Sequence, residues 1–167
     1  MNNANGLSRK HILSVLVDNQ PGVLSRVTGL FSGRGFNIDS LCVSETLDPL
    51  VSRITLTAEG DMAVLEQIKK QLNKLINVIK VWDFTDKEFV QRESALVKIR
   101  AKGEDRAEIL RNADIFHATV VDVASETYTL EVTGDEGKIC AFIKLLKPFG
   151  IKEIARTGPV ALARDRK

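Results

Sequence analysis

The fold is decided by residues 11–41, which read HILSVLVDNQPGVLSRVTGLFSGRGFNIDSL. The first seven of them are rich in branched apolar side chains and predict a short strand. After the turn DNQPG (residues 18–22), apolar residues recur at helical spacing from Val23 to Phe31, which predicts an amphipathic helix. The glycines of GRG (residues 33–35) are expected to end this helix, because glycine adopts the left-handed conformation at little cost. The stretch therefore begins as strand, turn and helix.

The next strand, predicted over residues 36–46, has a break in its alternation. Ile38 belongs to one phase of the apolar pattern and Leu41 to the other. A shift of one residue moves every following side chain to the opposite face of a sheet. We therefore expect a bulge or an irregular entry near Asp39–Ser40.

The first half of the chain continues with three more elements. A turn at Asp48–Pro49 leads to a strand in which Ile54 to Ala58 alternate with polar residues. Asp61 is expected to cap the following helix, and residues 78–84 predict a fourth strand. The resulting order is β-α-β-β-α-β.

The same order returns in the second half. The polar segment DKEFVQRES (residues 86–94) is interpreted as a linker. After it we expect a strand at 97–101, a helix at 104–112, strands at 117–124 and 127–134, a helical stripe at 139–149 and a closing strand at 151–162. The predicted fold class is α+β, with two consecutive ferredoxin-like βαββαβ modules. The predicted domains are residues 9–85 and 95–163, joined by the linker 86–94.

Size and composition limit the function classes. The chain has 167 residues, enough for one ordinary domain or two small ones. A formal net charge of +2 is too small for a protein that binds through phosphate attraction. Two cysteines cannot build a disulfide framework, and no apolar run approaches the length that crosses a membrane. We expect a cytoplasmic protein, and a homodimer, because small modules with an exposed sheet edge need a partner.

Motifs of catalysis, metal binding and nucleic-acid binding are absent from the sequence. It contains no G-x-S-x-G, H-E-x-x-H, C-x-x-C or P-loop pattern. His11 and His117 are interpreted as surface or strand-edge residues, and Cys42 and Cys140 as packed or half-buried thiols, so no metal site is expected. Aromatic residues make up 5% of the chain, and the first strand of each half has none, so the base-stacking platform of RNA-binding modules is missing.

The turn DNQPG is the remaining candidate for chemistry. Pro21 presets the turn, and Gly22 would let a ligand approach the backbone closely. Free N–H groups at the start of a helix attract a carboxylate, and Asn19 offers both a donor and an acceptor. On the Pro-Gly dipeptide alone, an ordinary helix entry with nothing bound is the commoner explanation.

The context of the turn changes this interpretation. The strand, the N-x-P-G-x-L turn, the amphipathic helix and the broken strand FNIDSL together resemble the ACT domain, a ferredoxin-like regulator that senses amino acids. The likeness is closer still to the regulatory (small) subunit of bacterial acetolactate synthase, also called acetohydroxyacid synthase. SRITLTAEGD and VLEQIKKQLNKLINVIKV extend it through the first half, and LVKIRA, IFHATVVDV, YTLEVTG, GKICAFI and IARTGPVAL through the second.

This resemblance implies a subunit without catalytic residues of its own. Such subunits bind and activate a large catalytic subunit, and they confer feedback inhibition by valine in branched-chain amino acid biosynthesis. Thiamine diphosphate, Mg and FAD are expected only in that partner. The family's effector lies between two ACT domains of a homodimer, and Pro21 varies in the family and is given no direct role. Carried to this sequence, the effector-binding residues are Asn19, Gln20, Gly22, Val23 and Leu24 of one chain, with Asn37 and Ile38 of the other.

Two other functions stay open on the sequence. A free-standing ACT-domain sensor could regulate a different protein, which binding to the large subunit would distinguish. A small enzyme on a ferredoxin-like scaffold would show turnover by the isolated chain. The sequence does not choose among valine, leucine and isoleucine, because a single methylene changes binding to an apolar pocket by only about 1–3 kcal/mol. The turn AKGEDR of the second module lacks the N-x-P-G pattern, so we do not expect it to bind the same ligand.

Overall fold

The computed structural model describes residues 9–33 and 36–165. Contacts divide them into two compact units. Unit 1 contains the described residues up to Val90 together with those from Ala161, and unit 2 contains Gln91–Val160. None of the described helices is long and apolar enough to cross a membrane.

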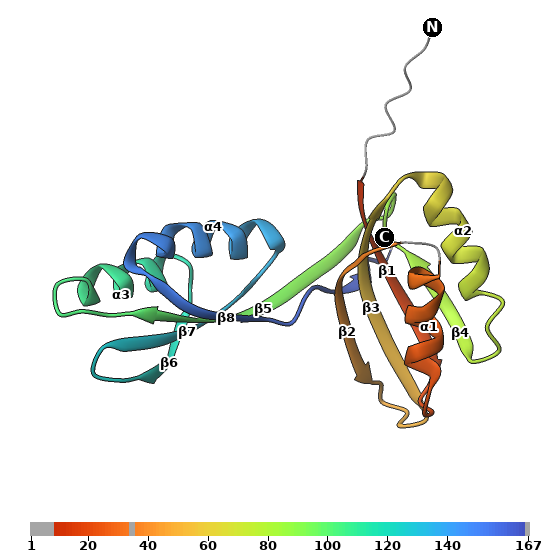
Figure 1. The fold of residues 1–167 in the computed structure, drawn as a ribbon, viewed down its shortest axis with the longest axis horizontal. Helices are drawn as coiled ribbons and strands as arrows, with labels where there is room; N and C mark the ends of the chain where they lie inside the picture. The colour runs from red at the N-terminus through yellow and green to blue at the C-terminus, as the bar shows by residue number, and fades with distance from the viewer. Residues whose placement is uncertain (1–8, 34–35, 166–167) are drawn as a thin grey trace, which may run out of the picture. The chain divides into compact units, whose positions relative to one another are not determined.

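Unit 1 is a four-stranded antiparallel sheet covered by two helices. Its elements are β1 (Arg9–Asp18), α1 (Val23–Ser32), β2 (Ile38–Glu45), β3 (Val51–Gly60), α2 (Met62–Leu72) and β4 (Val78–Asp83). The strand order is β2-β3-β1-β4, and both helices lie on one face of the sheet (Figure 1). This order confirms the ferredoxin-like fold predicted for the first half.

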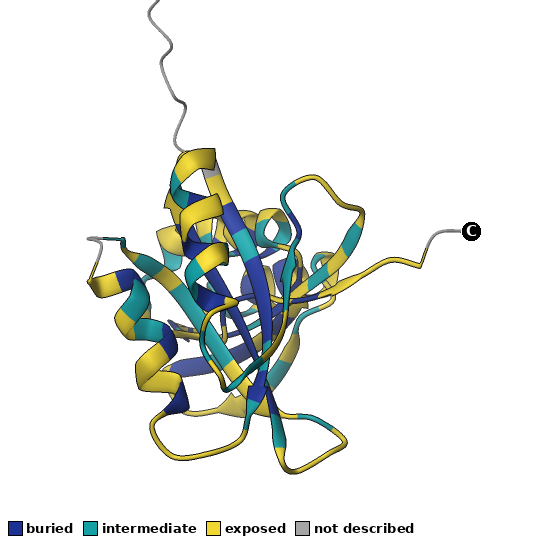
Figure 2. Ribbon diagram, turned by 90° about the vertical axis from the view of Figure 1, so that its right-hand side faces the viewer, coloured by how far each residue is buried: buried dark blue, intermediate teal, exposed yellow. Residues whose placement is uncertain are grey.

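The core of unit 1 lies between the sheet and the helices. Alternate residues of β1, namely Leu13, Val15 and Val17, are at most 2% exposed, and they pack with Phe31 of α1 and Leu72 of α2. Figure 2 shows this burial concentrated along the strands and on the inner sides of the helices. The period of two in the strand and of 3.6 in the helices therefore places these apolar side chains in one core.

Three local predictions in unit 1 can be compared with the structure. The pairing of β2 with β3 shifts register between Ile38 and Ser40, which confirms the predicted bulge. The side chain of Asp61 accepts a hydrogen bond from the amide of Val64 (2.8 Å), which confirms the predicted cap. The predicted end of α1 is confirmed, because the helix ends at Ser32 with Gly33 as its C-cap, but Gly33 is right-handed with φ −64° and not left-handed as expected. Arg34 and Gly35 lie outside the described residues.

Unit 2 repeats the same architecture. Its elements are β5 (Phe89–Arg100), α3 (Arg106–Ile115), β6 (Thr119–Val123), β7 (Thr127–Gly134), α4 (Glu136–Leu146), a 3₁₀ turn η1 (Lys147–Phe149) and β8 (Ile151–Arg156), with β9 (Val160–Ala163) following. The sheet order is β6-β7-β5-β8, with α3 and α4 on one face (Figure 1). The second ferredoxin-like module is thereby confirmed.

The segment predicted as a linker is largely a strand. Residues 89–94 form the first half of β5, so this strand begins in unit 1 and ends in unit 2. Its polar composition is explained by pairing: Glu93, only 4% exposed, accepts hydrogen bonds from Arg156 Nε (2.6 Å) and Nη2 (2.8 Å). The guanidinium partner allows the carboxylate of Glu93 to be buried within a strand. The sequence alone shows only a polar segment, which is why it was interpreted as a linker.

The closing strand of the second half is also divided. Residues 151–162, expected as one strand, form β8 and β9 with Gly158–Pro159 between them. Gly158 has φ +73°, and proline lacks the N–H that a ladder requires. β9 pairs with β5, and its residues from Ala161 onwards belong to unit 1, whereas the sequence assigned residues up to 163 to the C-terminal domain.

Candidate functional site

The β1–α1 turn, residues 19–22, carries the first group of predicted effector residues. Gly22 is the N-cap of α1 and has φ +83°, a left-handed conformation that favours glycine. A Cβ added at Gly22 would meet nothing within 4 Å, so the surface there is open. Within the described part of the chain, no side chain caps the helix. The amide of Val23 donates to the carbonyl of Gln20 (3.3 Å), whereas the next amides of α1, those of Leu24 and Ser25, have no acceptor among the described residues and are available to an anionic group.

The side chain of Asn19 is partly committed within its own chain. Its Nδ2 donates to Glu45 Oε1 (3.1 Å) and to the carbonyl oxygen of Pro49 (2.9 Å), and its backbone N–H donates to Leu50 (2.8 Å). Because an amide nitrogen has only two protons, Asn19 has its Oδ1 acceptor to offer to a ligand. An acceptor suits the ammonium group of an amino acid and not its carboxylate.

Asn77 anchors the turn from outside the predicted set. Its Nδ2 donates to Asp18 Oδ2 (2.9 Å), its Oδ1 accepts from Arg26 Nη1 (2.7 Å), and its carbonyl accepts from the amide of Asp18 (2.9 Å). These bonds tie the end of β1 and the first turns of α1 to the loop before β4. Asn77 is 58 residues from Asn19 in sequence, and no motif marks it, so sequence reasoning missed it.

The expected apolar contacts differ in exposure. Val23 is 3% exposed and belongs to the core of unit 1, whereas Leu24 is 40% exposed. Leu24 is thus the apolar side chain of this turn that a ligand can reach from outside. Gln20 is exposed, and its amide donates to the carbonyl of Asp18 (3.0 Å).

The second group of predicted residues lies at the start of β2. Asn37 is exposed and donates to Asp39 Oδ1 (3.0 Å), and Ile38 is half-buried against the core. Asp18, which precedes the β1–α1 turn, is opposite Val51, whereas Ile38 is opposite Ala58. These two positions on β3 are seven residues apart, or roughly 23 Å along the strand. One chain therefore does not bring the two groups together.

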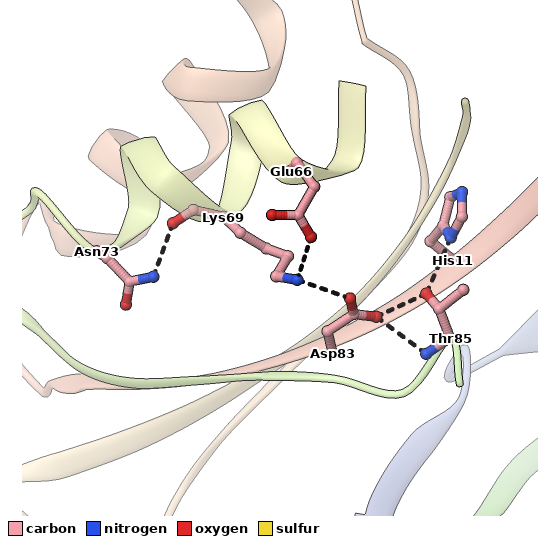
Figure 3. A network of polar contacts seen from close by, with 6 residues as sticks. All are labelled: His11, Glu66, Lys69, Asn73, Asp83 and Thr85. Carbon is pink, nitrogen blue, oxygen red and sulfur yellow. Dashed lines mark hydrogen bonds and ion pairs between the residues drawn. The ribbon is translucent and has the colours of Figure 1, made fainter. Parts of the chain in front are cut away.

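A polar network lies elsewhere in unit 1, between α2 and the end of β4. Lys69 Nζ donates to Glu66 Oε1 (2.6 Å) and Asp83 Oδ2 (3.0 Å), while Asp83 Oδ1 accepts from the hydroxyl (2.6 Å) and the amide (2.9 Å) of Thr85 (Figure 3). His11 Nδ1 is 3.0 Å from Thr85 Oγ1, and its Nε2 donates to the carbonyl of Gly60 (3.0 Å). The expectation that His11 is a surface residue is wrong, because it is 2% exposed and these bonds satisfy it.

The charges of this network stabilise one another. Burial alone raises the pKa of Asp83, but the two donors of Thr85 and the Lys69 ammonium outweigh it and hold that pKa below its ordinary value. The hydrogen bond to Glu66 raises the pKa of Lys69 against the opposing effect of burial, with Asp83 acting in the same direction as Glu66. The Thr85 hydroxyl lies beside His11 Nδ1, but its proton is donated to Asp83 Oδ1 (2.6 Å), so the hydroxyl is committed to the carboxylate.

Metal-binding clusters are not found in the described ranges. No group of three or more His, Cys, Asp or Glu side chains there could hold a metal ion. Cys42 is half-buried in β2, which confirms the packed or half-buried thiol expected there, whereas Cys140 is exposed on α4, so the same expectation is wrong for Cys140. His117, with φ +51°, is exposed after α3.

Comparison with known proteins identifies the family. The family profile described as "AHAS small subunit-like ACT domain" matches residues 13–80, and the profile described as "Small subunit of acetolactate synthase" matches residues 92–165. The "Probable acetolactate synthase small subunit" of Methanothermobacter thermautotrophicus is 54% identical over 158 residues, which cover 94% of each chain. The chain belongs to the family of acetolactate synthase small subunits.

Other small subunits extend this assignment to structure. The acetolactate synthase small subunit of Aquifex aeolicus is 52% identical, over 96% of this chain and 84% of its own. The crystal structure of the small subunit from Thermotoga maritima has a TM-score of 0.87 and 43% identity, covering 95% of this chain and 99% of that one. The resemblance drawn from the sequence is confirmed, and it spans both ferredoxin-like units.

Proposed function

We propose that this chain is the regulatory subunit of an acetolactate synthase. In this role it binds the large catalytic subunit, raises its activity and makes it sensitive to valine. The observation that carries the proposal is the membership of the small-subunit family over nearly the whole chain, with an ACT-domain match in the first half. Thiamine diphosphate, Mg and FAD would be held by the catalytic partner.

The geometry of the β1–α1 turn supports an amino acid as the effector. A carboxylate would meet the amides of Leu24 and Ser25 beside Gly22, where no side chain of the described chain competes for them. The ammonium group would meet Asn19 Oδ1, whose neighbouring Nδ2 is already engaged. Leu24 supplies an exposed apolar contact for an aliphatic side chain, and burying an isopropyl group contributes about 1.5–3 kcal/mol.

The proposed site needs two copies of the chain. Asn37 and Ile38 lie at the far end of the sheet from the turn of their own chain, so they would complete the site on a second copy. An effector that contacts both copies favours the dimer arrangement in which the site is closed. The free energy of closing this site couples effector binding to the attached enzyme, with a typical allosteric coupling of about 1–3 kcal/mol.

Reconstitution with the catalytic subunit tests this function. Adding the purified chain should raise acetolactate formation several-fold, and valine added afterwards should suppress most of that gain. Leucine and isoleucine, titrated in parallel, define the selectivity. Binding to the catalytic subunit without any effect of a branched-chain amino acid would contradict the effector proposal, and absence of binding would favour a free-standing sensor.

A further inference from the structure

Unit 2 contains a charged hollow that none of the preceding functions uses. It has a volume of about 240 Å³ and is lined by Arg100, Lys102, Glu126 and Lys152. These residues come from the end of β5, the turn after it, the turn between β6 and β7, and the second residue of β8. We call this site the basic hollow.

The basic hollow occupies the place in unit 2 that the effector turn occupies in unit 1. In unit 1, the last residue of β1, Asp18, donates its amide to Asn77 before β4, and the next residue, Asn19, donates to Leu50 in the β2–β3 turn. In unit 2, the last residue of β5, Arg100, donates its amide to the carbonyl of Gly150 before β8 (3.0 Å). The next residue, Ala101, donates to Glu126 in the β6–β7 turn (2.9 Å). The two units thus share one backbone arrangement at this corner.

The side chains at the shared corner differ in charge between the units. Unit 1 presents Asn19 and Leu50 there, whereas unit 2 presents three cations against the carboxylate of Glu126. The turn also contains Glu104 and Asp105, which do not line the hollow. Among the described residues, the four side chains that line the basic hollow make no hydrogen bond or ion pair with one another. Three neighbouring cations repel one another, and a bound anion would relieve that repulsion.

The corner is held in place by residues behind it. Arg106 donates from Nε to the carbonyl of Ala101 (3.1 Å) and from Nη2 to that of Ser125, and its guanidinium lies 5.6 Å from the Tyr128 ring centroid. The turns that carry Lys102 and Glu126 are therefore fixed to each other. Gly150 has φ +90°, which favours glycine, and it lies against the Arg100 side chain, whose Cδ would be 3.4 Å from a Cβ at this position.

We propose that the basic hollow binds a small anion with at least two negative charges, of the phosphate or polycarboxylate class. The cations of Arg100, Lys102 and Lys152 would contact its oxygens, and Glu126 would accept a hydrogen bond from a hydroxyl or amine of the ligand. This site is distinct from the proposed amino acid site, because every lining residue belongs to unit 2. The small volume favours a compact molecule over a protein segment.

Nuclear magnetic resonance of the ¹⁵N-labelled full chain tests this proposal. Inorganic phosphate and citrate are titrated separately at low ionic strength, with acetate as the monovalent control. The amides of residues 100–102, 126 and 150–152 should shift and saturate with phosphate, citrate or both, and acetate should leave them unchanged. Saturation by only one of the two probes assigns the phosphate or the polycarboxylate class. Shifts spread over all surface lysines would overturn the proposal.

Two variants of opposite sign make the test specific. Lys102→Gln should weaken binding roughly three- to tenfold, as expected for removal of one exposed charge-assisted contact. Glu126→Gln should tighten it by a similar factor, because it removes the repelling carboxylate. Lys70→Gln on α2 is the matched control and should change nothing. Equal affinities in Lys102→Gln and Lys70→Gln would overturn the site. The proposal would also be overturned if neither probe bound and Lys102→Gln captured the catalytic subunit more weakly. That result would assign the hollow to binding an acidic protein surface.

Discussion

At the scale of single residues, Gly22 has a left-handed backbone conformation and lies where the effector's carboxylate is proposed to bind. Its φ of +83° lets the chain turn sharply into α1 while leaving the amides of Leu24 and Ser25 without an acceptor in the described part of the chain. A side chain at this position would project into open space, where the carboxylate of the effector is proposed to lie. The position therefore separates effects on ligand binding from effects on packing.

Substitution of Gly22 by aspartate should weaken valine binding selectively. Gly22→Asp places a carboxylate in the proposed anion site, and we expect calorimetry to show at least about a tenfold loss of affinity, equivalent to about 1.4 kcal/mol. Gly22→Asn has the same shape and a similar strain in the left-handed region, about 1 kcal/mol, without the charge. It should retain more affinity than Gly22→Asp.

Gly103→Asp is the control for the added charge, whereas Gly22→Asn controls for backbone strain, because Gly103 does not have the positive φ of Gly22. Gly103 lies in the corresponding turn of unit 2 and also has nothing within 4 Å of an added Cβ. This variant should bind valine as the unaltered chain does. Unchanged affinity in Gly22→Asp would contradict the placement of the effector.

Asp83 gives the molecule a predictable response to acid. Its pKa is depressed in the folded state, so the stability that it contributes is present above the ordinary carboxyl pKa and is lost as pH falls through the folded value. We expect the free energy of unfolding to decrease below about pH 4, where a free aspartate also becomes protonated. Asp83→Asn should lower stability at pH 7 by about 1–2 kcal/mol and should flatten this acid dependence.

Urea unfolding between pH 2.5 and 7 measures this effect. Asp86→Asn changes an exposed carboxylate three residues away and serves as the control. The idea is wrong if Asp83→Asn and Asp86→Asn have the same unfolding midpoints at every pH.

Lys69 acts at the opposite limit of pH. Its pKa is raised, so the stability that it contributes is lost only as pH rises above the ordinary value for lysine.

His11 illustrates what a sequence does not show at this scale. Its partners, Gly60 and Thr85, are 49 and 74 residues away, and neither is marked by a motif. A histidine at the start of a strand resembles an exposed one until the fold places a hydrogen-bond partner beside each ring nitrogen. Burial of a polar side chain depends on such distant partners, which local patterns do not reveal.

At the scale of elements, periodicity explains which predictions were successful. The phase break between Ile38 and Leu41 located the bulge of β2, because side-chain alternation has a period of two wherever one face is buried. The start of β5 was missed because Glu93 is charged, and its partner Arg156 lies 63 residues further on. The candidate site shows the same limit: the turn was predicted from its own residues and its role as an effector site from the family resemblance, whereas its anchor Asn77 was not predicted.

β9 is a short element with an expected effect on the unit that it joins. Its Ala161 is 3% exposed, and the amide of Arg164 donates to the carbonyl of Glu88 (3.0 Å) within unit 1. A chain ending at Gly158 loses these contacts, and we expect unit 1 to be destabilised by about 1–2 kcal/mol. Hydrogen exchange should then accelerate in β1 to β4 and stay unchanged in the core of unit 2.

A chain ending at Arg164 is the control for this truncation. It retains β9 and should exchange as the full chain does. Faster exchange confined to α3 and α4 after truncation at Gly158 would show that β9 stabilises unit 2 instead.

At the scale of the whole molecule, two sheet edges are candidates for self-association. β2 and β6 end the two sheets, and each exposes a valine, Val43 at 42% and Val121 at 48%. An unpaired edge of this kind is a template for pairing with another chain, and a lysine on it opposes such pairing. Because the proposed effector site needs the start of β2 from a second copy, the edge of unit 1 is the expected interface.

Sedimentation velocity at micromolar concentration tests this expectation. The unaltered chain should sediment as a dimer, and Val43→Lys should shift it toward monomer by about tenfold or more in dissociation constant. Val121→Lys should leave the dimer intact. The reverse pattern would place the interface on unit 2, and a monomeric unaltered chain would contradict the shared site.

The roughly 23 Å between the β1–α1 turn and the start of β2 has a genetic consequence. If every pocket takes its turn from one copy and its strand from the other, a lesion in the turn and a lesion in the strand are complementary. Hybrids of a Gly22→Asp chain with an Asn37→Ala chain would contain one doubly damaged pocket and one wholly native pocket. Co-expression of two valine-insensitive alleles would then restore a partial response to valine.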